Sequence, residues 1–598
     1  MGIKEMFGMN YEVNKVKDKN EENTQEGVIS IAPELTLDMD DADLIDLKKK
    51  WMIAWDNYNG KILKRQNASE DYWLGKHHGV NDLDDDDKPF VDNLMFEAVE
   101  TFLPVATKKN AEPLVFPKDG KDQEALASAK KFRNALMVEA DIQKLRFTIK
   151  KAARHWALYF IGVINIGYDS EEDNIFTKAI MPKQVILDPD GYIEGAEFTG
   201  DYIGVYREDK ASDLVKKFPG KAKEIKAKAK DKMGSKIRYI EWWTRDTFFF
   251  TLDDMVLDKF KNPHWNYDEE EETILEDGTR KTVDKVGRNH FKKRKLPFSF
   301  ISVFQIGNQP HDNTSLIHQN MSNQDVINKR NRQIDKNVDS QNNGIVLSGK
   351  NFTKEQAAEA VEELRQGGGL YVPEGSIEGS YKRDTAPSLP SDVYNSLQDS
   401  RSEMRNIFGI TGLSAQGLQG DQTVRGKIMT KDADGSRVGG GITEYIEMAI
   451  DEVFNWWIQL MHVYYVYEDR DFTTLGSDKT TDSVTLEERD YEYDIVVSVK
   501  EGSLIPRDPL LERNEAIELW GAGGIDPISL FEKMDFPDPK ESAKALFLWQ
   551  TNPAVLFQDD PEISQMMAQQ QAQQMQGQAP TQPNLAEPGG DLLGQVPI

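Results

Sequence analysis

Residues 314–337, TSLIHQNMSNQDVINKRNRQIDKN, form the stretch that most strongly determines the fold. The stretch has the spacing of a helix, but its apolar residues make only a thin stripe among amides and charges. That stripe consists of Leu316, Ile317, Met321, Ile327, Ile334 and the following Val338. A helix in the core of a monomer would carry a broader apolar face, so we expect a helix that packs against copies of itself around a wet interior.

A small module and a second long helix are expected downstream. Thr353 is placed to cap a helix, with Gln356 at the capping-box position, and Ser391 is placed to cap another helix after Pro390. The pattern predicts, in order, a strand at 345–347, a helix at 353–366, a strand at 370–372 and a helix at 391–408. We therefore expect a small α/β module inserted between two helices.

A segment rich in glycine and glutamine, residues 409–426, follows the second helix. It contains five glycines in eighteen residues, so we expect a loop with unusual backbone freedom. Beyond it, a broad apolar face predicts a helix from about Thr443 to Tyr467. Further glycines at 435 and 439–441 leave the end of the loop and the start of that helix open.

The chain upstream of residue 314 alternates helical and strand patterns. Helices are expected at 43–65, 91–104 and 123–160, and strands at 162–168, 179–187, 202–206 and 237–252. The lysines of segment 216–232 lie nearly all round a helix, which favours a solvated surface helix over a phosphate-binding patch. These patterns together predict a mixed α+β fold.

The length and the two ends of the chain suggest several parts. A chain of 598 residues is expected to form about two to four packed subdomains. Residues 1–40 are polar and acidic, as in a flexible arm, and residues 561–598 resemble a disordered tail rich in Gln and Pro. Short helices are expected before that tail, at 509–520, 527–534 and 540–549.

The composition excludes several classes of protein. With 102 acidic and 73 basic residues the formal charge is −29. This charge argues against a protein that binds nucleic acid by neutralising phosphates over a broad face, but not against one along whose surface DNA slides. The chain has no cysteine, which excludes disulfides, thiol nucleophiles and cysteine zinc sites. The longest apolar stretches, 156–168 and 456–467, are shorter than the roughly 20 residues that span a bilayer, so no membrane segment is expected.

The sequence contains no complete catalytic motif. The stretch from Gly420 to Ile428 fails as a phosphate-binding loop, because five residues separate its glycines and Ile428 stands where Ser or Thr is needed. The eight histidines are scattered, and the four adjacent carboxylates of Asp84–Asp87 cannot converge on one ion. We therefore expect no enzyme activity, no cofactor and no metal.

The order of the elements resembles the portal family of tailed bacteriophages over roughly residues 45–550. The N-terminal half supplies an aromatic helix with Trp51 and Trp55, the segments Pro89–Pro104 and Pro113–Pro117, a strand ending in Asp188-Pro189, and Glu241-Trp-Trp-Thr244. The later block is the most specific. In it a polar helix, an α/β insertion, a helix ending in RNIFGITG (405–412), a Gly/Gln loop and a long aromatic helix follow in that order.

The resemblance implies a portal fold with wing, helical stem, small α/β clip and C-terminal helical crown. On that mapping the wing is residues 41–310 and 427–500, the stem helices are 311–339 and 391–408, the clip is 340–390, the tunnel loop is 409–426 and the crown is 501–560.

The resemblance also implies a function. Members of this family form a ring of about twelve copies at one capsid vertex of the virion, assembled in the host cytoplasm, through which double-stranded DNA enters and leaves. The implied partners are the terminase motor, the major capsid protein and a tail adaptor. About twelve copies would carry a total charge of about −350, which favours sliding of DNA over binding.

Candidate DNA contacts follow from the same mapping. The first choices, in the tunnel loop, are Gln416, Gln419, Gln422 and Arg425; the second choices, on the first stem helix, are Lys329, Arg330, Arg332 and Lys336. Salt bridges to a neighbouring subunit are an equal alternative for the stem cations. For the whole chain, the alternatives are another virion structural protein, such as a tail adaptor or scaffold, and more remotely a DNA-packaging enzyme.

Overall fold

The computed structural model describes residues 35, 37–77, 91–107, 111–170, 172–230, 232–267, 270–274, 280–284, 289–343, 345–347, 353–365, 381–383, 388–408, 424–475, 481–499, 509–534, 536 and 539–551. The chain divides into two compact units. The first unit comprises residues 1–473 and 483–506, and the second comprises residues 474–482 and 507–598.

The first unit begins with four helices: α2 (Asp41–Trp73), α3 (Leu94–Ala106), α4 (Gln123–Ile142) and α5 (Leu145–Tyr159). The side chain of Asn93 caps α3 by accepting from the Phe96 amide, and Asp122 caps α4 in the same way. Lys144 and Phe160, which flank α5, both adopt left-handed backbone angles and so turn the chain sharply at each end. α2 is longer than the sequence predicted.

A five-stranded antiparallel sheet has the strand order β10-β9-β8-β7-β4. Its strands are β4 (Val185–Leu187), β7 (Tyr202–Lys210), β8 (Lys236–Thr244), β9 (Thr247–Leu252) and β10 (Met255–Lys261). Residues 239–243 of β8 are all buried, so both faces of the sheet are covered there. On one face, Trp51 of α2 stacks on Tyr202 with ring centroids 4.4 Å apart.

A second sheet, of strand order β13-β2-β3, contacts α5 and α11. Its strands are β2 (Gly162–Asp169), β3 (Asn174–Ile180) and β13 (Phe298–Ile301). The start of β2 lies so close to α5 that a Cβ on Gly162 would lie 2.2 Å from the carbonyl oxygen of Ala152. Only glycine fits at this approach.

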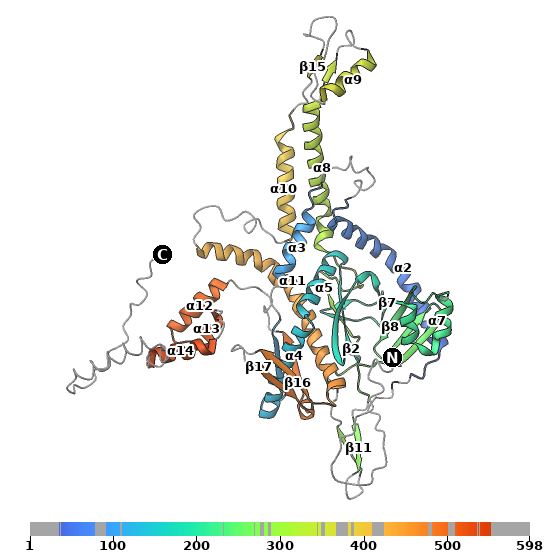
Figure 1. Cartoon of the computed structure of the whole chain (residues 1–598), viewed down its shortest axis with the longest axis vertical. Coiled ribbons are helices and arrows are strands. Elements are labelled where there is room, and N and C mark those ends of the chain that lie inside the picture. Colours follow the sequence, from blue (N-terminus) through green and yellow to red (C-terminus); the bar gives the residue numbers. More distant parts are fainter. Residues whose placement is uncertain are drawn as a thin grey trace, which may run out of the picture. The chain divides into compact units, whose positions relative to one another are not determined.

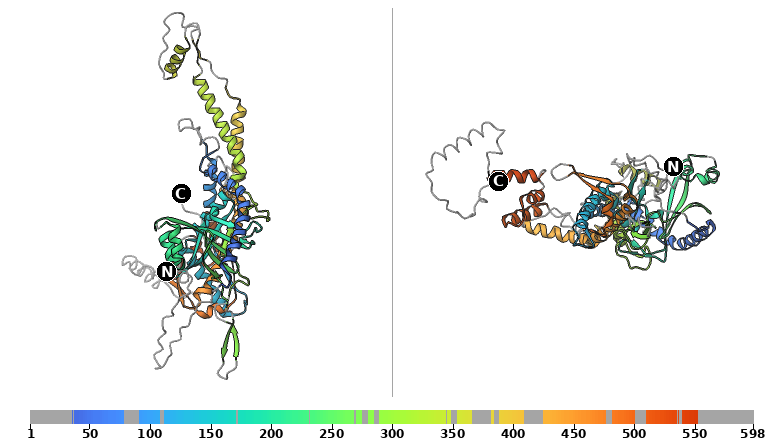
Figure 2. Two further views of the ribbon diagram at one scale, coloured as in Figure 1. Left: turned by 90° about the vertical axis from the view of Figure 1, so that its right-hand side faces the viewer. Right: turned by 90° about the horizontal axis from the view of Figure 1, so that it is seen from below.

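Two long helices, α8 (Leu316–Asn343) and α10 (Ser391–Phe408), lie side by side as an antiparallel hairpin (Figures 1 and 2). The module at its end consists of β14 (Ile345–Leu347), α9 (Lys354–Arg365) and β15 (Tyr381–Arg383), with β14 and β15 paired antiparallel. The predicted strand at 345–347 and both predicted helices are confirmed. The strand predicted at 370–372 lies outside the described residues.

Thr353 and Gln356 form the expected capping box. The Thr353 hydroxyl accepts from the Gln356 amide at 3.3 Å, and the Gln356 side chain accepts from the Thr353 amide at 3.2 Å.

The long helix α11 (Val424–Leu460) continues as a π-helical turn (Met461–Tyr465). The predicted start near Thr443 is wrong, because the glycines at 435 and 439–441 lie within the helix. Each glycine costs a helix about 1 kcal/mol, which is why the sequence pattern favoured a loop there. The last residues of the predicted loop, 424–426, are helical as well.

The remaining strands of the described part are short: β1 (Pro113–Pro117), which pairs with β18 (Ile495–Val499); β5 (Ile193–Glu194); β6 (Glu197–Phe198); β11 (Glu270–Ile274); β12 (Arg280–Asp284); β16 (Arg470–Leu475); and β17 (Thr481–Leu486). The lysine-rich segment forms two helices, α6 (Ala211–Lys217) and α7 (Ala222–Lys228), rather than the single helix expected. Most lysines of α7 and its flanks are exposed, as predicted for a solvated surface.

Two hydrophobic cores stabilise the first unit. One surrounds Trp156, Trp456 and Trp457 and joins α3, α4 and α5 to α11. The other surrounds Trp242 and Phe249 and joins the five-stranded sheet to α2. The predicted mixed α+β fold is confirmed.

The second unit contains three short helices: α12 (Pro509–Gly521), α13 (Pro527–Lys533) and α14 (Pro539–Thr551). Asp526 caps α13 by accepting from the amides of Ile528 and Ser529. All three helices were predicted, to within two residues at each end.

Candidate functional site

The hairpin of α8 and α10 carries the candidate residues that the structure describes. Lys329 and Lys336 are exposed and Arg332 is half-buried, donating from Nε to the Asn328 carbonyl at 3.2 Å. Arg330 instead links the two helices of the hairpin, because its Nε donates to the Ser396 hydroxyl of α10 at 3.3 Å.

Of the candidates in segment 409–426, Gln416, Gln419 and Gln422 lie outside the described residues. Arg425 lies in the first turn of α11, and its side chain is also outside the described part. The four cations on α8 are therefore the candidates whose surroundings the structure describes.

The root of the hairpin is a layer of buried amides on α8. Asn320, Gln324 and Asn328 follow one another at every fourth position and are almost fully buried. Asn328 donates to Nδ1 of His77 at 2.5 Å, and Nε2 of His77 lies 3.1 Å from the Tyr72 carbonyl. Burial lowers the pKa of His77, so the ring is neutral, with its proton on Nε2 facing that carbonyl.

Asp92, which precedes α3, ties both helices of the hairpin to the rest of the unit. Its carboxylate forms an ion pair with the Arg401 guanidinium of α10, and its carbonyl accepts from Gln324 of α8 at 2.6 Å. A weaker pair joins Arg405 of α10 to Glu97 of α3, 3.7 Å apart. The root of the hairpin is thus held by these polar contacts together with the hydrophobic core, to which α10 contributes Leu397, Met404 and Phe408.

A further contact joins α2 to α8. The Tyr72 hydroxyl donates to the Asp325 carboxylate at 2.7 Å. Burial raises the pKa of Tyr72 above its usual value, and the negative charge of Asp325 raises it further.

These contacts show one cause of the polarity of α8 that the sequence did not indicate. The polarity of segment 314–337 predicted a helix packed against its own copies around a wet interior, which stays a prediction, and three of its amides are buried inside one chain. The reason is that amide side chains can satisfy backbone and imidazole groups that an apolar side chain would leave unpaired. The spacing of Asn320, Gln324 and Asn328 was visible in the sequence, but Asp92, His77 and Arg401 gave no signal as their partners.

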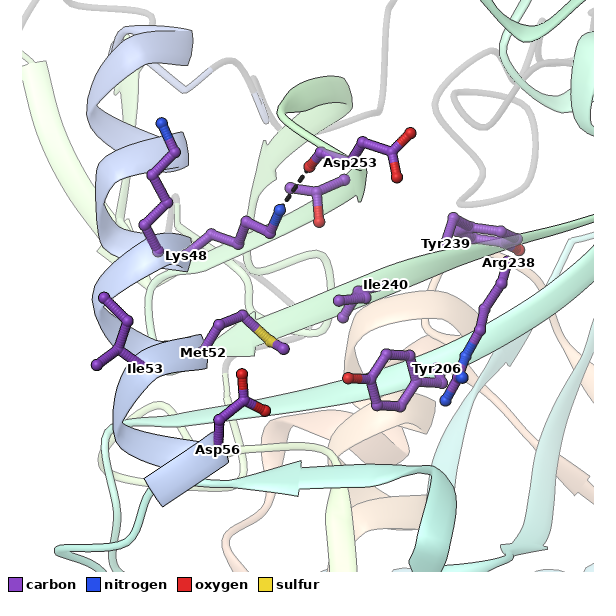
Figure 3. Close-up of a pocket in the computed structure, with 11 residues that line it drawn as sticks. Lys48, Met52, Ile53, Asp56, Tyr206, Arg238, Tyr239, Ile240 and Asp253 are labelled. Atoms are coloured by element: carbon purple, nitrogen blue, oxygen red, sulfur yellow. Dashed lines mark hydrogen bonds between the residues drawn. The ribbon is translucent and has the colours of Figure 1, made fainter. Parts of the chain in front are cut away.

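A recess of about 560 Å³ lies between α2 and the strands β7, β8 and β9 (Figure 3). Lys48 reaches across it and donates to the Asp253 carbonyl at 2.5 Å, while the Arg238 guanidinium stacks over the Tyr206 ring at 3.7 Å. These two cations are held by the walls of the recess rather than aimed at its centre. The geometry therefore favours a structural recess over a reactive one.

Metal sites and membrane-spanning helices are two further classes of feature to consider. Within the described ranges, no three histidine or carboxylate side chains gather as metal ligands would. In that same part of the chain, no helix is both long and apolar enough to cross a membrane.

Comparison with known proteins gives three results. Among curated proteins there is no significant match. A solved chain described as part of the virion of a native gene transfer agent particle is similar at 10% sequence identity, with 74% of this chain and 89% of that chain covered and a TM-score of 0.33. The family model of the phage P22-like portal proteins matches residues 80–588, a range that contains α3, both sheets, the hairpin, its module and α11. The chain therefore belongs to the phage P22-like portal protein family.

Proposed function

We propose that the chain is the subunit of a portal ring at one capsid vertex, a non-enzymatic channel through which double-stranded DNA is packaged and later ejected. The match of the portal family model over residues 80–588 carries this proposal. The ring would dock the terminase motor during packaging and a tail adaptor afterwards, and would be seated among major capsid proteins.

The structural parts take roles in this proposal. Helices α8 and α10 are the stem, and the module of β14, α9 and β15 is the clip that meets the motor. The two sheets with α2–α5 and α11 form the wing, and α12–α14 form the crown. An antiparallel helical hairpin ending in a small separate module suits these roles, because a partner can bind the module without disturbing the two hydrophobic cores of the first unit.

The charge of the chain supports passage of DNA rather than its capture. A chain of formal charge −29, repeated around a ring, repels phosphates over most of its surface. Gln416, Gln419, Gln422 and Arg425 remain our candidates for direct DNA contact, since neutral amides can touch a backbone without trapping it.

The assembly is tested by native mass spectrometry and negative-stain electron microscopy of the purified full chain. We expect rings of about twelve copies with a central hole. A stable monomer or dimer, or a preparation that hydrolyses ATP or cuts DNA, would refute the proposal. Filaments or closed shells without a hole would instead favour a scaffold.

The channel role is tested by deleting residues 412–420. We expect rings to form normally while DNA packaging, or retention of packaged DNA, falls. Loss of the rings themselves would show that this segment holds subunits together and does not line a channel.

A further inference from the structure

One face of α8 carries a stripe of cations. Lys329, Arg332 and Lys336 are spaced three and four residues apart, which places them on the same side of the helix. This side is not the one that packs on α10, where Arg330 meets Ser396. Neither Lys329 nor Arg332 forms an ion pair with any described residue of its own chain, so their charges are available to a second molecule.

One face of α10 carries a matching stripe of acids. Asp392, Asp399 and Glu403 are all exposed, are spaced seven and four residues apart, and pair with no cation in the described part of the chain. The two arginines of α10 are used elsewhere, because Arg401 and Arg405 both contact carboxylates near α3. The exposed face of α10 is therefore acidic, whereas the stripe on α8 is basic beyond Asp325, whose exposed carboxylate accepts from the Tyr72 hydroxyl.

The two stripes lie at matching heights along the hairpin. The contact between Arg330 and Ser396 fixes the register of the antiparallel helices to within about one turn. In that register Lys329 lies opposite Leu397, which is two residues from Asp399. Arg332 lies opposite Tyr394, which is two residues from Asp392. Two residues of helix correspond to about 3 Å, which a flexible side chain spans easily.

We infer that these stripes join neighbouring copies of the chain, with Lys329 and Arg332 of one stem facing Asp399 and Asp392 of the next. The inference rests on the proposed ring. Copies related by rotation about an axis along the hairpin present equivalent residues at equal height, so the opposite charges meet between chains although they form no pair within one. It assigns the stem cations to subunit contact rather than to DNA.

The test uses charge reversal in the full chain. Lys329→Asp and Asp399→Lys are compared with the double variant that carries both changes, and Arg332→Asp with Asp392→Lys forms a second, independent set. The control is Glu403→Lys, because Glu403 is equally exposed on the same stripe but lies about 9 Å along the helix from the level of Lys329.

The readout is the protein concentration at which half the chains are in rings, measured by sedimentation at about 50 mM salt and again at about 1 M. Each single reversal should raise that concentration about tenfold, which corresponds to about 1.4 kcal/mol per interface. The double variants should return to within about threefold of wild type, and the control should stay within about twofold. At high salt the differences should largely vanish, because the charges are screened.

Three outcomes would overturn the inference. Single variants that assemble like wild type but package less DNA would place these cations in the channel. Single variants that fail and are not rescued in the double variants would show that the two stripes do not meet. If wild type itself forms no rings, the proposed function fails too, and that result is distinct from both others. Rescue by the double variant also excludes misfolding as the cause of the single defects.

Discussion

Arg401→Met is the change that best tests how the hairpin of α8 and α10 is anchored. In the structure Arg401 pairs with Asp92, and their side chains are only 29% and 21% exposed. Methionine keeps most of the aliphatic length of arginine, so the packing of α10 is retained while the charge and its hydrogen bond are removed. The Asp92 carboxylate then loses its cation in a half-buried place, although its carbonyl still accepts from Gln324.

The expected magnitude follows from this geometry. A hydrogen bond between two charged groups contributes about 1.5–3 kcal/mol when it is largely shielded from water. We take about 2 kcal/mol for the loss, which corresponds to about a 30-fold rise in the population of the locally opened hairpin.

Hydrogen exchange followed by mass spectrometry measures this opening directly. Peptides from α10 should exchange about 30-fold faster in Arg401→Met, while peptides from residues 442–460 of α11 should not change, because α11 packs chiefly on β18 and β13 and takes no part in the Asp92–Arg401 pair. Arg405→Met is the matched control. Its 3.7 Å contact is to a Glu97 side chain that is 55% exposed, so we expect at most about a twofold effect. Equal effects of the two variants, or no change in α10 for Arg401→Met, would refute the assigned anchor.

Two further predictions concern the body of the first unit. Gly162→Ala should lower the free energy of unfolding by about 1–3 kcal/mol, because its Cβ would clash with the Ala152 carbonyl. Gly60→Ala lies in the middle of α2 with open space around its Cβ, so it should raise the free energy of unfolding by up to about 1 kcal/mol. Thermal unfolding of both variants and wild type at one protein concentration measures these opposite shifts. Burial lowers the pKa of His264 to about 3. Below about pH 6.5 the unfolded chain therefore takes up a proton that the folded chain excludes, and the free energy of unfolding decreases as the pH is lowered. His264→Gln should remove about 2 kcal/mol of the loss between pH 7 and 5, measured by urea unfolding; an unchanged pH dependence would contradict the assignment.

The histidine effect has to be read as a difference between wild type and variant. Burial raises the pKa values of Glu139 and Glu452 to about 7 each, so these carboxyls take up protons in the folded state first. Their contribution to stability grows as the pH falls from about 7 towards the unfolded value of about 4.3. It opposes the contribution of the histidine, and the total pH dependence of wild type therefore does not report either group alone.

The sequence predicted those parts of the fold that short-range signals determine. The helix of residues 391–408 was predicted to the residue, because Pro390 directly precedes it and an apolar stripe runs to Phe408, but Ser391 is its first residue rather than the predicted N-cap. The capping box at Thr353 succeeded for the same reason.

Contacts between distant segments were not predictable in this way. The partner of β14 is β15, at residues 381–383, and nothing in either short strand specifies the other. Asp92, which anchors the hairpin, is separated from Arg401 by 309 positions in the sequence, so no local pattern pointed to it. The start of α11 was missed for a different reason, since local glycine content argued against a helix that the chain nevertheless forms.

The polarity of α8 has two separate causes along one helix, and this division bears on how a ring could work. Near its root, amides such as Gln324 and Asn328 are polar because they are buried against polar groups of the same chain. Further out, Lys329 and Arg332 are polar because they are left for a neighbour or for solvent. A root fixed within each chain and an outer stem governed by exposed charges would let subunit contacts change with salt while each hairpin stays attached. On this basis, salt should dissociate rings at concentrations that leave hydrogen exchange at the root unchanged. Arg401→Met should instead speed hydrogen exchange at the root and leave the rings assembled.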